Sequence, residues 1–381
     1  MTMSIPFQTI NVFTHTRFLG NPLAIAILRY HSNPSSNHTD QQSLTQQQKQ
    51  LLAREFNLSE TVFIHTTQAN YNNDDPTAPF VIDIFTTTQE LPFAGHPTVG
   101  AAWFLAQQGE WKSRTEFRLL TRAGEILVTR IPSISTNTIS GDVSDGVKQF
   151  VKVQVPIDFK THASYHSPTT STLKSELHQP LLGPSNFING INGSEPVASV
   201  VKGMSFMLMQ LQNEETLAKF QPLHGISEAE FRIPDEHLGD WKGFSGLYVF
   251  VVIPNTRSTF HSGFNSCSIF DGIDLNNDDT DSHYTTIRVR TRMFQGGGFE
   301  DPATGSAAST LCGWLAVQNG VGKWRFEVIQ GVEIGRESRI GVLVNVDKDM
   351  DGSGNGLDGL VVRKIELVGG AVKVMEGLIE I

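Results

Sequence analysis

Apolar and polar positions alternate along both halves of the chain in a similar way, with many strands and few helices. In the first half, a pattern typical of strands recurs at residues 7–13, 23–28, 61–65, 80–86, 116–120, 125–131 and 150–155. Residues 43–56 place apolar side chains at helical spacing behind Ser43 or Thr45, either of which can cap a helix. A second helix is expected over residues 97–108, and because most of its faces are apolar it should be buried.

The second half repeats this order after a long polar stretch. Residues 156–193 lose periodicity, which is typical of a linker or an insertion. Strands are then expected at residues 199–210, 247–253, 286–290, 325–330, 339–345, 359–367 and 371–381. Residues 302–319 form a second helix that is apolar on most faces. The natural packing of these elements is that each half of the chain wraps its strands around one buried helix.

Two short stretches, about two hundred residues apart, are near-copies of each other. They are Gly95-His96-Pro97-Thr98-Val99-Gly100-Ala101-Ala102 and Glu300-Asp301-Pro302-Ala303-Thr304-Gly305-Ser306-Ala307-Ala308. Aligned on Pro97 and Pro302, each places proline in a first helical turn and His96 or Asp301 at the N-cap. Helix N-termini attract anions, and two of them could grip a carboxylate from both sides. Each copy alone is also compatible with an ordinary helix start, so it is the matched pair that indicates a two-sided active site.

Composition excludes several classes of function. The net charge of −10 disfavours nucleic acid and anionic membranes as partners, and no apolar run reaches the length of a membrane span. We see no signal peptide, so a cytoplasmic location is expected. The two cysteines, Cys267 and Cys312, exclude a disulfide framework, and Cys312 is expected to be a core residue. The histidines form no metal-binding pattern, so no metal site is expected.

Three further features are candidates for chemistry: a glutamate, a pair of arginines and a run of glycines. Glu60, in a loop before a strand, is by default a solvated charge, unless it points towards the two helix starts. Arg290 and Arg292 could bind a substrate carboxylate, although arginines on a strand are more often exposed. Three glycines, residues 296–298, precede the second motif, but the lysine of a phosphate-binding loop is absent, so we expect only a tight approach to the helix.

Five stretches together resemble the PhzF-like, or phenazine-biosynthesis-like, family. They are Phe18–Ala24, Asn57–Thr61, Leu91–Pro97, Glu300–Ala307 and Ile329–Arg336. The resemblance implies an α+β diaminopimelate-epimerase-like fold, with two pseudo-symmetric halves that are each a β-barrel-like sheet around a central helix. The active site would lie in the cleft between the halves. The expected division is 1–155 with the returning strand 371–381, a linker at 156–195, and 196–370.

The same resemblance implies site residues. Cofactor-free epimerases of this fold use two cysteines at the helix starts, where this chain has Ala94 and Thr304, so thiol chemistry is not available. The phenazine-pathway member isomerises trans-2,3-dihydro-3-hydroxyanthranilate. Carried over from it, Glu60 is the general acid/base, while Asp301 and His96 polarise the substrate and assist proton transfer. The remaining substrate contacts are the backbone at Gly95 and Gly305, with Ser306 beside them.

The resulting hypothesis is a cofactor-independent isomerase that shifts a proton on a small carboxylate substrate, in a homodimer as in typical members. One alternative is an epimerase or racemase of an amino-acid-like substrate, in which Asp301 acts on the face opposite Glu60. Another is a binding protein that retains the cleft without turnover.

Overall fold

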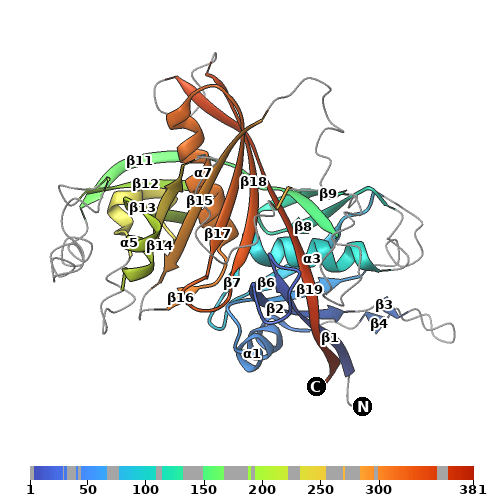
Figure 1. Ribbon diagram of the computed structural model, residues 1–381. Coiled ribbons are helices and arrows are strands. Elements are labelled where there is room, and N and C mark those ends of the chain that lie inside the picture. The colour runs from blue at the N-terminus through green and yellow to red at the C-terminus, as the bar shows by residue number, and fades with distance from the viewer. Residues whose placement is uncertain are drawn as a thin grey trace, which may run out of the picture. The chain divides into compact units, whose positions relative to one another are not determined.

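The computed structural model describes residues 4–28, 30–31, 40–41, 44–66, 77–108, 114–131, 149–166, 188–189, 194–221, 232–254, 269–270, 284–295, 299–349 and 359–381. They form two compact units (Figure 1). Unit 1 contains Met1–Pro156 and Val368–Ile381, and unit 2 contains Ile157–Asp271 and Asn276–Leu367. A short further segment of unit 1, Gly272–Leu275, lies outside the described residues, as does Cys267.

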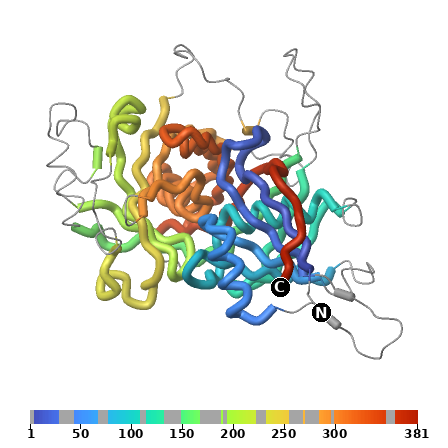
Figure 2. Tube along the Cα trace, turned by 90° about the horizontal axis from the view of Figure 1, so that it is seen from below, coloured from blue at the N-terminus to red at the C-terminus, as the bar shows by residue number. Residues whose placement is uncertain are grey.

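The strands of unit 1 close into a ring around one helix. They are β1 (Ser4–Val12), β2 (Asn21–Leu28), β5 (Thr61–His65), β6 (Phe80–Phe85), β8 (Glu116–Thr121), β9 (Gly124–Ile131), β10 (Phe150–Gln154) and the end of β19 (Leu360–Glu380). Each pairs with the next, and β19 pairs with β1, from Ser4 opposite Glu380 to Val12 opposite Ala371. Figure 2 shows this red C-terminal segment beside the blue first strands.

Helix α3 (Gly95–Gln107) occupies the interior of this ring and is buried along nearly its whole length. Gly100 allows the close contact, because a Cβ atom there would lie 2.9 Å from Cγ2 of Val12. Helix α1 (Gln46–Phe56) is capped by Thr45 and packs against β5 and β6. Two short strands, β3 (Tyr30–His31) and β4 (Asp40–Gln41), pair separately, and β7 (Glu90–Leu91) pairs with β6.

Unit 2 repeats this order. Its strands are β11 (Lys160–His166), β12 (Ser194–Val201), β13 (Met204–Gln210), β14 (Phe244–Ile253), β15 (Thr285–Phe294), β16 (Glu300–Asp301), β17 (Gly322–Gln330) and β18 (Ser338–Lys348). As in unit 1, two of the pairings are parallel, β13 with β14 and β15 with β17. The buried helix is α7 (Gly305–Asn319), and the short helices are α5 (Glu214–Lys219), α6 (Asp235–Leu238) and η3 (Gly239–Trp241).

Several elements differ from the sequence-based expectations. Residues 199–210 are two strands rather than one, because Lys202 and Gly203 form a turn between β12 and β13. Residues 359–367 and 371–381 are parts of one continuous strand, β19. The segment 156–195, expected as a linker or insertion, contains β11, which pairs with β12 in unit 2; residues 167–187 and 190–193 lie outside the described part.

Strand pairing also shows that the expected register between the two motif copies was wrong. Glu90 and Leu91 pair with Phe85 and Ile84, just as Glu300 and Asp301 pair with Phe294 and Met293. The equivalent segments are therefore Glu90–His96 and Glu300–Ser306, which pair Pro92, rather than Pro97, with Pro302. The alignment on Pro97 was displaced by five residues because proline is tolerated both before a helix and inside its first turn.

The expected positions at the helix starts change with this register. The N-caps are Ala94 for α3 and Thr304 for α7, so neither His96 nor Asp301 is an N-cap. His96 is the second residue of α3, whereas Asp301 lies in β16, ahead of the helix. Proline opens neither helix, since α3 begins at Gly95 and α7 at Gly305.

Candidate functional site

The sequence around Glu60 places its carboxylate beside the first turn of α3. Helix α1 ends at Phe56, and the left-handed backbone of its C-cap, Asn57 (φ 50°), turns the chain into the loop that precedes β5. Glu60 is the last residue of that loop, and 16% of its side chain is exposed. Its Oε2 lies 3.6 Å from Nε2 of the buried His96.

His96 is a neutral imidazole in this setting. Burial lowers its pKa from 6.5 to about 3, and a backbone hydrogen bond with Pro22 opposes this shift only in part. The contact with Glu60 is therefore not an ion pair at neutral pH, but a carboxylate beside an uncharged ring. Nδ1 of the ring lies 3.4 Å from Nδ2 of Asn21, whose Oδ1 accepts a hydrogen bond of 3.4 Å from Ser59. The sequence analysis missed Asn21 as a site residue, although it lies in the family-like stretch Phe18–Ala24.

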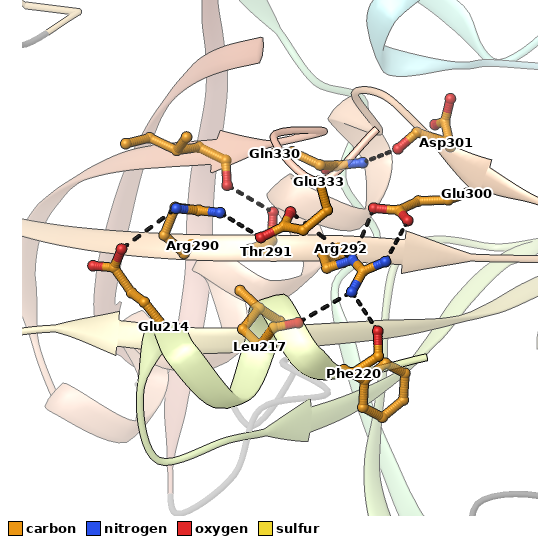
Figure 3. A network of polar contacts seen from close by, with 11 residues as sticks. Glu214, Leu217, Phe220, Arg290, Thr291, Arg292, Glu300, Asp301, Gln330 and Glu333 are labelled. Atoms are coloured by element: carbon orange, nitrogen blue, oxygen red, sulfur yellow. Dashed lines mark hydrogen bonds and ion pairs between the residues drawn. The ribbon is translucent and has the colours of Figure 1, made fainter. Parts of the chain in front are cut away.

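In unit 2, Asp301 is buried and tied to the start of α7. The Thr304 hydroxyl donates to Oδ2 of Asp301 and accepts from the Gln330 amide at 3.1 Å, and it makes no capping bond to the helix. The Gln330 amide donates to the Asp301 carbonyl at 2.8 Å, as Figure 3 shows. Ala94 also provides no cap, so neither N-cap side chain bonds to the first turn of its helix. That turn begins with Gly95 and His96 in α3 and with Gly305 and Ser306 in α7.

Gln330 links Asp301 to a buried tyrosine. Its Oε1 lies 2.9 Å from the hydroxyl of Tyr248 and accepts from the Thr304 backbone N–H at 3.3 Å. The same hydroxyl lies 3.0 Å from Oγ1 of Thr291, and burial raises the pKa of Tyr248 well above its ordinary value. Gln330 belongs to a family-like stretch, whereas Tyr248 lies in an apolar strand that has no signal in the sequence.

Arg290 and Arg292 are neither exposed strand arginines nor free to bind a substrate carboxylate, the two roles considered for them. Both are buried and already hold carboxylates of the protein: Arg292 binds Glu300 through two nitrogens, and Arg290 binds Glu333 at 2.6 Å. A guanidinium whose donors are used in this way is not available for substrate. The glycines at residues 296–298 lie outside the described residues.

The corrected register shows that the two units carry different chemistry at equivalent places. Thr61 pairs with Phe85 as Leu247 pairs with Phe294, so the equivalent of Glu60 is Gly246. Glycine offers no acid/base side chain, and a Cβ atom at Gly246 would lie 2.6 Å from Cε of Met293 and 3.1 Å from the carbonyl oxygen of Phe294, so this position is tightly packed. Asp301 corresponds to Leu91, and His96 corresponds to Ser306.

The structure thus groups Glu60, His96 and Gly95 within unit 1, and Asp301, Gly305 and Ser306 within unit 2. Among the described residues, no three His, Cys, Asp or Glu side chains form a candidate metal site. Cys312 is buried in α7, as expected of a core residue, and burial raises the pKa of its thiol well above the ordinary value. Within the same part of the chain, no helix has the length and apolarity to cross a membrane.

Comparison with solved structures defines the class of fold. The chain is similar over its full length to a PhzF-family phenazine biosynthesis protein of Bacillus anthracis, with a TM-score of 0.63, 19% identity and 100% of both chains covered. It is also similar to a hydroxyproline epimerase of Agrobacterium vitis, with a TM-score of 0.52, 10% identity and coverage of 99% and 93%. The expected α+β epimerase-like fold is confirmed.

The family follows from the sequence match. The model of the phenazine biosynthesis-like (PhzC-PhzF) family matches residues 10–239 and 269–377, so the chain belongs to this family. An uncharacterised isomerase of Pasteurella multocida is 28% identical over 89% of this chain and 86% of that protein. The trans-2,3-dihydro-3-hydroxyanthranilate isomerase of Pseudomonas chlororaphis is 28% identical over 83% and 86%. The family and these relatives make the chain an enzyme of the isomerase class.

Proposed function

We propose that this enzyme is a cofactor-independent isomerase that shifts a proton within a small carboxylate substrate, with Glu60 as the single acid/base. The observation that carries the proposal is the contact between the Glu60 carboxylate and the buried, neutral His96, 3.6 Å apart at the first turn of α3. A mostly buried carboxylate is a suitable general base, and an uncharged imidazole can assist it without neutralising it.

In the proposed reaction, Glu60 removes a proton from a carbon of the substrate. The electron pair of the broken C–H bond moves into the adjacent unsaturated system, and protonated Glu60 then returns the proton to another carbon of the same molecule. His96 and Asp301 polarise the substrate. The N–H groups at Gly95 and Gly305, together with Ser306, bind its carboxylate at the positive ends of the helix dipoles.

A single acid/base also separates this proposal from the epimerase alternative. Two-base inversion needs one ionisable group for each face of the stereocentre. The equivalent positions at the helix starts hold Ala94 and Thr304, and the equivalent of Glu60 is Gly246, so inversion would have to use Asp301 as its second base. The related Pseudomonas isomerase suggests trans-2,3-dihydro-3-hydroxyanthranilate as the first substrate to test. We also propose a homodimer, which light scattering can check.

The test is to incubate the enzyme with this compound in heavy water and to follow proton shift and deuterium uptake by NMR. Glu60→Gln should lower the rate by at least about a hundredfold, because general acid–base catalysis contributes roughly 10²–10⁴-fold. Glu55→Gln is a matched control, since Glu55 is exposed on α1, the helix that precedes the loop of Glu60, and it should leave the rate unchanged.

Full activity of Glu60→Gln would exclude the proposed role of Glu60. A product of inverted configuration carrying deuterium at its stereocentre would support the epimerase alternative. Binding without turnover, detected by thermal shift in a metabolite screen, would support the binding-protein alternative.

A further inference from the structure

Five charged side chains of unit 2 form an ionic chain in which the sign alternates (Figure 3); four of them are buried or partly buried, and Glu214 at one end is exposed. The members, in order, are Glu214 of α5, Arg290 of β15, Glu333 of the turn after β17, Arg292 of β15 and Glu300 of β16. Successive members lie 3.4, 2.6, 3.9 and 2.7 Å apart. The chain therefore ties together four separate segments of the unit.

The strongest link is the fork between Arg292 and Glu300. Nε and Nη2 of Arg292 donate to the two carboxylate oxygens at 2.9 and 2.7 Å, and these side chains are only 4% and 8% exposed. The third nitrogen, Nη1, donates to the carbonyls of Leu217 and Phe220. A bidentate, fully used guanidinium allows one geometry only, so Glu300 cannot rotate without leaving a buried charge unpaired.

This fork fixes the backbone next to Asp301. Glu300 and Asp301 are consecutive residues of β16, and consecutive side chains of a strand point to opposite faces. Figure 3 shows Glu300 turned towards Arg292 and Asp301 turned away from it. Holding Glu300 on one face therefore sets the position of the Asp301 side chain on the other, where the Thr304 hydroxyl binds it, while Gln330 binds the Asp301 backbone carbonyl.

Glu333 extends this hold to the turn that lies against Pro302. Gly331, at the start of the turn, has a φ of +76°, and a Cβ atom there would lie 2.6 Å from the carbonyl oxygen of Pro302. The turn is closed by the N–H of Arg336, which donates to the carbonyl of Gly331 at 2.8 Å. Pro302, which follows Asp301, is thus also held in place, because it lies against the turn that Glu333 links to the ionic chain.

We propose that this ionic chain of five side chains positions Asp301, with Arg292 and Glu300 as the positioning residues. The inference rests on the proposed function to the extent that Asp301 acts on substrate there. It goes beyond that function by giving a role to five charged residues that do not touch the reacting atoms.

Unit 1 contains the matching element without this device. Glu90 is the equivalent of Glu300, and it pairs at 2.7 Å with Arg122, whose side chain is 61% exposed. The equivalent of Arg292 is Asp83, which pairs with Lys49 instead, and Leu91 stands where unit 2 has Asp301. The buried, bidentate pair of Arg292 and Glu300 thus occurs in unit 2, whose short strand β16 carries Asp301, the carboxylate proposed to act on substrate. Glu90→Gln is therefore a matched control for Glu300→Gln.

The experiment compares Glu300→Gln, Glu300→Asp and Glu90→Gln with the unaltered protein by amide hydrogen exchange and thermal unfolding. Glu300→Asp keeps the charge but is too short to maintain both hydrogen bonds, and it serves as a second variant if Glu300→Gln does not fold. We expect the amide hydrogens of residues 300–306 to exchange roughly tenfold faster in both Glu300 variants, through local opening. In Glu90→Gln their exchange rates should stay unchanged.

If the enzyme converts trans-2,3-dihydro-3-hydroxyanthranilate, kcat of the Glu300 variants should fall about ten- to a hundredfold, because small displacements of an acting group have effects of that size. Their KM should change far less. If the unaltered enzyme does not convert this compound, the proposed substrate fails, and the exchange result alone decides the positioning role. Unchanged exchange between Glu300 and Ser306, or equal acceleration there in Glu90→Gln, would overturn the proposal.

Discussion

The pH dependence of stability should report a partly buried cluster of charged side chains in unit 1 that the proposed chemistry does not use. Lys49 of α1 and His65 of β5 both contact Oδ2 of Asp83 of β6, His65 at 2.7 Å and Lys49 through a short hydrogen bond. Only 8% of the Lys49 side chain and 18% of the Asp83 side chain are exposed. Burial by itself raises the pKa of Asp83, but the hydrogen bonds from His65 and Lys49 outweigh it and lower the pKa from 3.8 to about 2.

The size of the effect follows from this shift. A pKa lowered from 3.8 to about 2 corresponds to about 2.4 kcal/mol of unfolding free energy when Asp83 is ionised in both states. Because the folded-state pKa is the lower one, this stabilisation is complete well above pH 3.8 and is lost as the pH falls towards about 2. The contribution should therefore be about 2.4 kcal/mol at pH 5 and about 1.3 kcal/mol at pH 3.

Urea unfolding of the unaltered protein and of Asp83→Asn, followed by circular dichroism at both pH values, measures this change. The difference in unfolding free energy between the two proteins should shrink by about 1 kcal/mol from pH 5 to pH 3. Glu125→Gln is the control: Glu125 belongs to an exposed pair with Arg118 at 2.9 Å, and its loss should cost less than about 1 kcal/mol. A difference for Asp83→Asn that does not change with pH would refute the reasoning.

Two further predictions concern the candidate site. Tyr248→Phe should lower the unfolding free energy by about 1–3 kcal/mol, because it removes the hydroxyl that lies 3.0 Å from Thr291 and 2.9 Å from Gln330 in a buried network; urea unfolding that shows no loss would contradict this. Because burial lowers the pKa of His96 to about 3, the pH–rate profile should contain no limb from His96 between pH 5 and 8. Loss of such a limb in His96→Gln would show that the ring titrates in that range.

Much of the fold could be predicted from local pattern. Residues 97–108 and 302–319 are apolar on most faces, and they correspond to the two buried helices, α3 and α7. Helix α1 was expected behind Ser43 or Thr45, and it is Thr45 that forms its capping box. Hydrophobic periodicity is sufficient for such elements because it records which face of each segment meets the core.

The register of the internal repeat could not be obtained in the same way. Local identity matched Pro97 with Pro302, whereas the resemblance that places Ala94 opposite Thr304 matches Pro92 with Pro302. The residues of β6 and β15 that pair with the short strands decide for the second register. The partners of Arg292 were equally hidden. Glu333 and the carbonyls of Leu217 and Phe220 are distant in sequence, and a pattern of exposed and buried positions does not show which charges meet.

By itself, the sequence determined the types of residue available for chemistry, the doubled arrangement of strands around a buried helix, and the family-like stretches that contain Glu60, His96 and Asp301. Tertiary structure alone decided that burial makes His96 neutral, that Gly246 stands where a second Glu60 would be, and that Arg292 is bound by Glu300. The physical reason is that hydrophobic periodicity depends on residues that are close together in the sequence. In contrast, pKa values, steric room and ion pairs depend on atoms that only the folded chain brings within a few ångströms.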